Sequence, residues 1–251
     1  MSLSAAPTND PRLSALQRGL ASLQLEASPA TQARLLNYLD LLLKWNRHYN
    51  LTAIRDAQTA LTHHLLDCLA IVPSLDRHFQ ASRNHADLHD SDPAAESAPK
   101  AEEAVRGSHQ QQAVRILDVG SGAGLPGVVL AAMRPQWSLT CVDSVAKKAS
   151  FVRQVAAELS VPNLRSEHSR VEQLQQPGFD LVVSRAFASL ADFVGCTRAQ
   201  LATGGCWVAM KGKLPAEEIA VLPGNVTVFH VEPIVVPGLP AQRCLVWMRP
   251  A

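Results

Sequence analysis

Residues 116–127, ILDVGSGAGLPG, are the part of the sequence whose residue types and spacing best fit a chemical role. An apolar run ends here, and Gly120, Gly122 and Gly124 separate it from a run with helical character. Glycine allows a tight turn and lets a ligand approach the backbone, while the N-terminus of a following helix favours negative groups. Asp143 ends the next apolar run, 23 residues after Gly120, where a carboxylate can bind ribose hydroxyls. These features predict a site for a nucleotide-type cofactor.

The spacing of this glycine loop distinguishes two cofactor classes. A dinucleotide fingerprint requires GxGxxG, but Leu125 occupies the last position when the pattern is counted from Gly120. Asp118, just before the loop, favours S-adenosyl-L-methionine, because this cofactor has no pyrophosphate and carries an ammonium group that a carboxylate can help to hold. The stretch DVGSGAG from Asp118 to Gly124 resembles motif I of the class I methyltransferases. S-adenosylmethionine is therefore the predicted cofactor, and an oxidoreductase that uses NAD is the remote alternative.

The segment after the fourth predicted strand narrows the class of methyl acceptor. Residues 184–190, SRAFASL, lack the Asn/Asp-Pro-Pro-aromatic stretch of enzymes that methylate adenine amino groups. Neither Cys196 nor Cys206 has the neighbouring proline common beside the nucleophile of RNA cytosine-C5 methyltransferases. An acceptor that is already nucleophilic, such as guanine N7, needs no general base, so orientation and proximity supply the catalysis. We therefore name no catalytic side chain. A small-molecule or protein acceptor remains the alternative.

Several longer motifs resemble one family. KWNRHYNLTAIRD, HHLLDC, DVGSGAGLPG, SRVEQL, SRAFASL and MKGK occur in the order found in the small-subunit ribosomal RNA methyltransferase G family, also called glucose-inhibited division protein B. The resemblance covers nearly the whole chain apart from residues 81–112. It implies methyl transfer from S-adenosylmethionine to N7 of a guanosine in the 530 loop of bacterial 16S rRNA, on naked rRNA or on the 30S particle.

The resemblance also implies which residues contact the cofactor. Val171 and Glu172 of SRVEQL would flank the adenine, and Arg185 of SRAF would lie beside the cofactor and the target. Val171 can instead belong to the core, and Arg185 can instead pair with Asp180 or a backbone carbonyl. The full predicted cofactor set is Gly120, Gly122, Leu125, Asp143, Ser144, Val171, Glu172 and Arg185.

The motif KWNRHYNLTAIRD, residues 44–56, predicts a surface as well as a helix end. The helix dipole explains cations at its C-terminus, but it does not require the aromatic and amide residues among them. We expect Trp45 and Leu51 to pack inward. The predicted RNA contacts are Lys44, Arg47, Asn50 and, from the KGK stretch, Lys211. Candidates to stack on a displaced base are Trp45, Tyr49 and Phe187.

The elements that must position these residues alternate along the second half of the chain. Runs rich in β-branched residues predict buried strands over 114–119, 138–143, 179–184 and 205–211. Helical runs lie between them over 125–133 and 145–159. Such alternation indicates a mostly parallel sheet with helices on both faces. Residues 226–234 and 243–249 are expected to close it as an antiparallel pair, which gives a Rossmann-like α/β fold.

Three regions follow from changes in composition. Residues 1–80 predict an N-terminal helical extension, with helices over 11–25, from a Ser28-Pro29 start signal, and over 57–70, ending before Pro73. Residues 81–112 carry six acids, three cations and only two large aliphatic residues, which predicts a disordered acidic insertion. Residues 113–251 form the predicted cofactor-binding domain.

Composition limits the remaining classes. The 251 residues are 47% hydrophobic, with a net charge of +1, which argues mildly against a strongly basic nucleic-acid binder. No apolar run approaches the roughly 18 residues of a membrane span. The five cysteines show no CxxC or metal-ligand spacing, so we expect reduced, mostly buried thiols and no metal. A cytoplasmic monomer without membrane contact is the resulting expectation.

Overall fold

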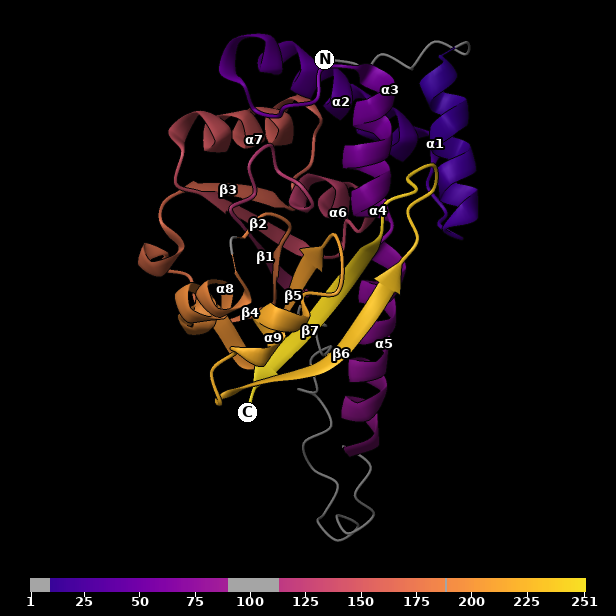
Figure 1. Cartoon of the computed structure of the whole chain (residues 1–251). Helices are drawn as coiled ribbons and strands as arrows, with labels where there is room; N and C mark the ends of the chain where they lie inside the picture. The colour runs from indigo at the N-terminus through magenta and orange to yellow at the C-terminus, as the bar shows by residue number, and fades with distance from the viewer. Residues whose placement is uncertain (1–9, 90–112, 188) are drawn as a thin grey trace, which may run out of the picture.

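The computed structural model describes residues 10–89, 113–187 and 189–251, with the side chains of all of these except 82–89. In this part of the chain seven strands form one sheet with the order β3-β2-β1-β4-β5-β7-β6 (Figure 1). The first five strands in this order run parallel, and β7 pairs antiparallel with β5. The predicted antiparallel pair of β6 and β7 is confirmed. The strands are β1 Arg115–Val119, β2 Ser138–Asp143, β3 Leu164–His168, β4 Phe179–Ser184, β5 Leu201–Lys211, β6 Val226–Ile234 and β7 Arg243–Pro250.

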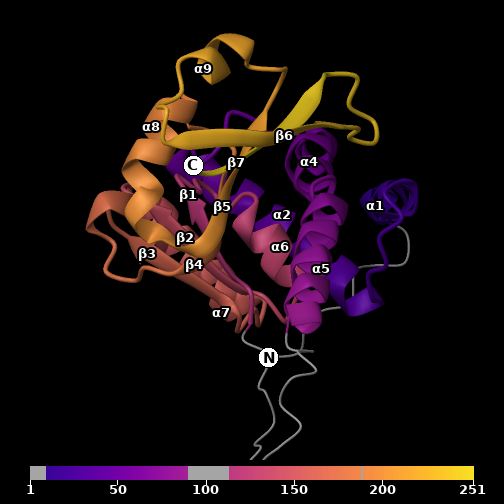
Figure 2. The same ribbon diagram turned by 90° about the horizontal axis from the view of Figure 1, so that it is seen from below.

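Alternating side chains of the central strands face two different layers. Ile116 of β1 belongs to a buried cluster with the helical extension, α6 (Gly127–Met133) and α7 (Ala146–Glu158). Its neighbour Leu117 belongs to a second cluster with α8 (Leu190–Thr197), and α9 (Ala216–Ala220) packs against that cluster. Figure 2 shows the sheet with α8 on one side and α2, α5 and α6 on the other. The prediction of helices on both faces is therefore confirmed, because each face of β1 is apolar and buried.

The helical extension shares one core with the sheet. It contains α1 (Pro11–Ser22), α2 (Pro29–Tyr49), α3 (Ala57–Ala60), a π-helical turn η1 (Leu61–Leu66), α4 (Asp67–Leu69) and α5 (Val72–His89). The predicted start of α2 is confirmed, because the Ser28 hydroxyl accepts a 3.1 Å hydrogen bond from the Thr31 N–H. Leu35, Leu39 and Leu42 of α2 are fully buried in the cluster that also contains α6 and α7. The extension is thus packed directly on one face of the sheet.

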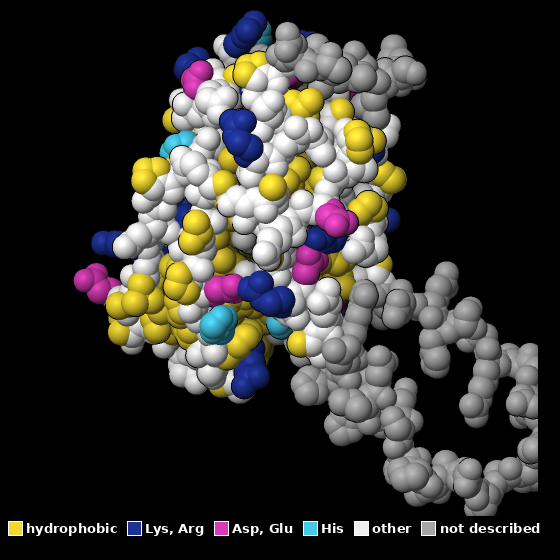
Figure 3. Space-filling view, turned by 90° about the vertical axis from the view of Figure 1, so that its right-hand side faces the viewer, with side chains coloured by type: hydrophobic (Ala, Val, Ile, Leu, Met, Phe, Trp, Pro, Cys, Tyr) yellow, Lys and Arg dark blue, Asp and Glu magenta, His cyan; other side chains and the backbone are white. Residues whose placement is uncertain are grey.

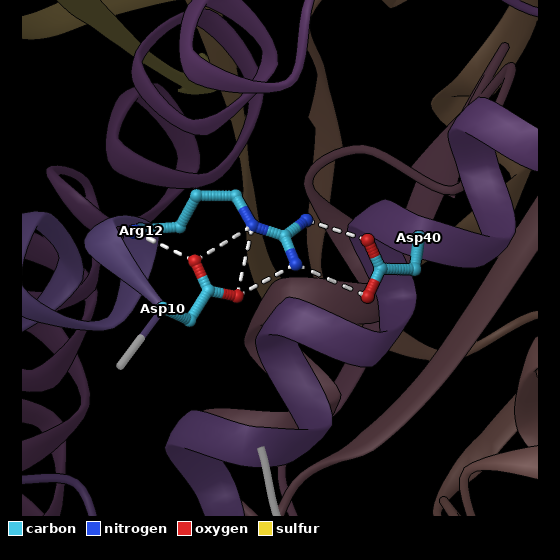
Figure 4. Close-up of polar contacts among 3 residues, drawn as sticks. All are labelled: Asp10, Arg12 and Asp40. Atoms are coloured by element: carbon cyan, nitrogen blue, oxygen red, sulfur yellow. Dashed lines mark hydrogen bonds and ion pairs between the residues drawn. The ribbon is translucent and has the colours of Figure 1, made fainter. Parts of the chain in front are cut away.

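A charged cluster joins the first two helices. Asp10 caps α1 by accepting a hydrogen bond from the Arg12 N–H. The Arg12 guanidinium lies between Asp10 and Asp40 of α2 and bonds to both carboxylates (Figure 4). Because Arg12 is largely enclosed and contacts both acids in a forked geometry, this cluster fixes α1 against α2 more firmly than one exposed ion pair would.

One predicted boundary was wrong, and one helix was not predicted. The third predicted helix ends before Pro73 as expected, because α4 ends at Leu69. Pro73 lies in the first turn of α5, the helix that was not predicted, where its missing N–H costs no hydrogen bond. Because α5 continues to His89, residues 81–89 are helical instead of belonging to the predicted disordered insertion. The remainder of that insertion, residues 90–112, lies outside the described residues.

The strand β3 was not predicted from the spacing of apolar residues. Its sequence, LRSEH, is polar apart from Leu164, which is the one buried residue of the strand. β3 forms the edge of the sheet, where outward-facing polar residues are usual and the alternating apolar signal is weak. Its backbone pairs with β2 from Leu139 to Asp143, and it therefore extends the edge on which the cofactor is predicted to bind.

Candidate cofactor cleft and its surroundings

The glycine loop follows β1 and takes a backbone path that favours glycine. Gly120 and Gly124 have φ angles of +64° and +84°. A Cβ added at Gly124 would lie 2.5 Å from a methyl carbon of Val128, so glycine is needed there for packing against α6. A Cβ added at Gly120 would have no heavy atom within 4 Å. The space beside Gly120 is open, and a ligand can approach the backbone there.

Asp118 connects the end of β1 to the start of α6. Its side chain is fully buried, and Oδ2 accepts a 2.8 Å hydrogen bond from the Gly127 N–H. Oδ1 has no hydrogen-bond partner among the described residues. Burial is the main cause that raises the pKa of Asp118 from 3.8 to about 7. A cationic group nearby would favour the ionised form, which fits the predicted role of Asp118 near the ammonium of S-adenosylmethionine.

Asp143 links the loop to the end of β2. Oδ2 accepts a 2.9 Å hydrogen bond from the Gly122 N–H, and Oδ1 accepts a 2.8 Å bond from the Val145 N–H. The Lys148 ammonium lies 3.8 Å from Oδ2. Each carboxylate oxygen can accept a further hydrogen bond. Asp143 therefore orders the loop and still has acceptor capacity for ribose hydroxyls.

Gly120 and Asp143 border a cleft of about 500 Å³ at the carboxyl ends of the parallel strands, the edge at which open α/β sheets bind ligands. Five predicted cofactor residues line it, together with Ala186 and Phe187, which follow Arg185. Leu125 is buried, and the Gly122 N–H bonds to Asp143; neither residue forms part of the wall. The predicted residues that do line the cleft are Gly120, Asp143, Ser144, Val171 and Glu172.

The composition of the cleft suits S-adenosylmethionine. The open space at Gly120 admits a ligand beside the backbone, and Asp143 offers acceptors for a ribose. Val171 serves two purposes, because its side chain lies in the second buried cluster and also borders the cleft. Its carbonyl accepts a hydrogen bond from Gln200, which fixes the backbone at the predicted adenine position.

Arg185 occupies the boundary between the cleft and the helical extension. Its Nη1 donates a 3.1 Å hydrogen bond to the His63 carbonyl and lies 3.5 Å from Asp67 Oδ2. The alternative pairing with Asp180 is not observed, since Asp180 accepts the Arg115 N–H instead. Sequence reasoning missed the contact with Asp67. The sequence feature that could have suggested this contact is a carboxylate in the motif HHLLDC and a cation in the motif SRAF. These two residues lie 118 positions apart.

The motif at 44–56 lies beside the same edge of the sheet. Trp45 packs against Phe151 of α7, with ring centroids 5.4 Å apart, and Leu51 is buried, so both packing predictions are confirmed. The Asn46 amide accepts the Thr52 N–H and donates to the Ile54 carbonyl, which holds the turn after α2. The predicted RNA contacts Lys44, Arg47 and Asn50 are exposed.

Lys211 lies apart from those three residues, at the end of β5. Its ammonium forms hydrogen bonds of 3.0 and 2.8 Å to the two Glu218 oxygens, so its charge is already paired. Of the candidates to stack on a displaced base, Phe187 lines the cleft. Tyr49 is exposed, and its ring contacts that of Trp45.

A second hollow, of about 600 Å³, lies near the loops that follow β5 and β6. Its wall is mainly apolar, with exposed Leu214 and Val235, and it includes no part of the glycine loop. It also lacks an acid comparable to Asp143. The smaller cleft is therefore the candidate cofactor site, despite the greater volume of this hollow.

The described residues form no membrane-spanning helix, no cluster of metal-ligating side chains and no disulfide. In the part of the chain that the structure describes, no helix is long and apolar enough to cross a bilayer. No group of three or more His, Cys, Asp or Glu side chains there is arranged to hold a metal ion. The five cysteines are free and four are buried, which confirms the prediction for the thiols.

The sequence model of the rRNA small subunit methyltransferase G family matches residues 31–88 and 102–246. Proteins named ribosomal RNA small subunit methyltransferase G from Polaromonas sp. strain JS666 and Acidovorax sp. strain JS42 are 50% and 51% identical over 234 and 236 residues. These alignments cover 93% and 94% of this chain, and 92% and 94% of the relatives. The structure of TrmN from Thermus thermophilus aligns at 18% identity and a TM-score of 0.45, over 55% of this chain and 44% of that one.

Proposed function

The chain belongs to the rRNA small subunit methyltransferase G family, and from this premise we propose that it transfers a methyl group from S-adenosylmethionine to N7 of a guanosine in the 530 loop of bacterial 16S rRNA. The observation that carries the proposal is the cleft where the glycine loop meets Asp143 at the carboxyl edge of the sheet. The protein is proposed to act as a monomer in the cytoplasm, on rRNA or on the 30S particle.

The proposed reaction depends on how the protein orients the two reactants more than on acid–base catalysis. When bound, S-adenosylmethionine supplies an electrophilic methyl group on a sulfonium. The N7 lone pair of guanine forms the new C–N bond while the C–S bond breaks and its electron pair returns to sulfur. No proton leaves the acceptor, so a general base is unnecessary, and holding both reactants in line supplies the rate enhancement.

Three groups of residues would divide this task. Asp143 and the backbone at Gly120 would hold the adenosine part of the cofactor, with Val171 and Glu172 beside the adenine. Arg185 would lie at its methionine end. Lys44 and Arg47, exposed on the end of α2 beside α7, would contact RNA phosphates, which position the substrate without reading its sequence.

The decisive experiment is transfer of a labelled methyl group to 16S rRNA and to 30S particles, both from cells that lack the enzyme. Nucleoside analysis should show N7-methylguanosine, and mapping should place it in the 530 loop. Asp143→Ala is the control that lacks the proposed ribose acceptor. A labelled product other than N7-methylguanosine, or rRNA that stays unlabelled in both forms, would refute the proposal.

A further inference from the structure

The carboxylate of Asp67 lies where the helical extension meets the carboxyl edge of the sheet. Asp67 starts α4, immediately after the π-helical turn η1, and only 4% of the residue is exposed. π-Helical turns are rare and occur often at functional sites. Asp67 is not among the residues predicted for the cofactor or for RNA.

Asp67 contacts two arginines that are far apart in the sequence. Its Oδ1 accepts a 2.8 Å hydrogen bond from Nε of Arg243, at the start of β7. Its Oδ2 lies 3.5 Å from Nη1 of Arg185, just past the end of β4. Because 3.5 Å is long for a hydrogen bond, this second contact is mainly ionic. The 3.1 Å hydrogen bond from Arg185 to the His63 carbonyl therefore sets the orientation of the guanidinium group. Asp67 and the His63 carbonyl thus both hold Nη1 of Arg185.

Arg185 keeps unused donors in this cluster. Asp67 is shared between two guanidinium groups, so neither has a carboxylate to itself. Arg243 uses a further donor on the Gln242 carbonyl. Within the described residues, Nε and Nη2 of Arg185 donate to no protein group, although the arginine side chain is only 26% exposed. Enclosed, charged donors favour a small anion over a solvated phosphate of an RNA backbone.

The methionine part of S-adenosylmethionine carries such an anion, together with an ammonium group. Ala186 and Phe187, which follow Arg185, line the cofactor cleft. Asp118 lies close enough for its charge to affect Arg185, and its Oδ1 has no partner among the described residues. This neighbourhood therefore offers both signs of charge that a zwitterionic amino-acid group requires.

We propose that Asp67 is a positioning residue for cofactor binding: it holds Arg185 so that the free guanidinium donors bind the carboxylate of the methionine part. The inference rests on the proposed function, which supplies the cofactor. It makes the helical extension part of the cofactor site, because both groups that hold Arg185 lie in HHLLDC.

Two ligands that differ at this end test the proposal. S-adenosylhomocysteine keeps the carboxylate, whereas 5′-methylthioadenosine lacks the amino-acid group. By calorimetry, Asp67→Asn should weaken S-adenosylhomocysteine binding by about tenfold or more, the range expected when a hydrogen bond to a charged group is removed. Binding of methylthioadenosine should change by less than about twofold, because its contacts do not involve Arg185.

Arg243→Gln is the matched control, because it removes the other partner of Asp67 and leaves the Arg185 contact in place. It should change the affinity for S-adenosylhomocysteine by less than about twofold. In an Arg185→Gln background, Asp67→Asn should have no further effect on this affinity, since a positioning residue acts through the residue it holds. A purely structural role would lower the melting temperature equally in both backgrounds without this cancellation.

Asp67→Asn leaves two enclosed arginines without a carboxylate, which can destabilise the fold. The double variant Asp67→Asn/Arg243→Gln removes one of them and should show the same selective loss of S-adenosylhomocysteine binding. Equal losses for both ligands, or unchanged binding of S-adenosylhomocysteine with a raised KM for rRNA, would overturn the proposal. If the wild type binds S-adenosylhomocysteine but does not methylate rRNA, only the proposed rRNA function fails.

Discussion

The hydroxyl of Tyr38 donates a 2.8 Å hydrogen bond to the carbonyl oxygen of Ala123. Tyr38 lies in α2 of the helical extension, and Ala123 lies in the glycine loop, 85 residues later. Tyr38 is fully buried and Ala123 is 5% exposed. The extension therefore holds the loop that borders the cofactor cleft, in addition to covering one face of the sheet.

Removing this hydroxyl should destabilise the fold. Tyr38→Phe leaves the Ala123 carbonyl buried without its partner, which is expected to cost about 1–3 kcal/mol in the free energy of unfolding. Tyr49→Phe is the control, since Tyr49 is 43% exposed and should change stability by less than about 0.5 kcal/mol. Urea unfolding of both variants measures the difference, and equal midpoints would contradict the role given to Tyr38.

A methyl group at Gly120 should block the cofactor without greatly weakening the fold. Gly120→Ala places Cβ in open space beside the cleft, at a φ of +64°. Gly204→Ala is matched to it: its φ is +80° and its added Cβ also meets nothing within 4 Å, but Gly204 lies in the first half of β5, away from the cleft. Each variant should lose about 1–2 kcal/mol through backbone strain, and calorimetry should show weakened S-adenosylhomocysteine binding for Gly120→Ala alone.

Folding stability should depend on pH through His64. Its Nε2 lies 2.9 Å from the Thr52 hydroxyl, and burial, with a smaller contribution from Arg185, lowers the pKa of His64 from 6.5 to about 4. Between these values the unfolded chain binds a proton that the folded chain excludes, so this contribution to stability is lost as the pH falls from 6.5 to 4. The full effect approaches about 3 kcal/mol.

The measurement compares wild type with His64→Gln, by denaturant unfolding across this pH range. The comparison is needed because Asp118, whose pKa is raised from 3.8 to about 7, contributes a slope of opposite sign. The stability of the wild type relative to His64→Gln should decrease with falling pH. Exposed His48→Gln controls for the removal of one histidine, and parallel curves for wild type and His64→Gln would refute the assignment.

The exposed cations at the end of α2 should contribute to RNA affinity by binding phosphates. Lys44→Ala/Arg47→Ala should raise the KM for rRNA and lower the slope of its salt dependence by about one for each phosphate that is no longer bound. Arg18→Ala is the control, because Arg18 is exposed on α1, away from the cleft. Figure 3 shows that cations on the side of the molecule carrying α1 are scattered among other residues. Unchanged salt dependence in the double variant would show that this surface does not bind RNA.

A substitution at Lys211 tests whether the position of a cation, and not only its charge, decides its effect on RNA binding. Its ammonium is paired with Glu218, and its side chain is 16% exposed. Lys211→Met should therefore change the salt dependence of the KM less than the double variant at α2 does. A larger change would place the RNA on the β5 side of the cleft and would favour a direct RNA contact for this lysine.

Much of the fold and part of the site could be predicted because their signals are local. The strand at Arg115–Val119, the glycines after it and Asp143 lie within one βαβ unit, so apolar runs and spacing suffice to relate them. β3 was missed because an edge strand needs few apolar residues, and α5 because proline both ends and begins helices. Both elements were missed because the local sequence is compatible with more than one structure.

The sequence by itself determined the parallel sheet, the cofactor loop and the family, since each depends on the order and spacing of neighbouring residues. Only the tertiary structure decided which partners Arg185 and the glycine loop have. Asp67 lies 118 residues from Arg185 and 176 from Arg243, and Tyr38 lies 85 from Ala123. These pairings exist because the helical extension packs on one face of the sheet, and a contact set by packing leaves no spacing pattern in the chain.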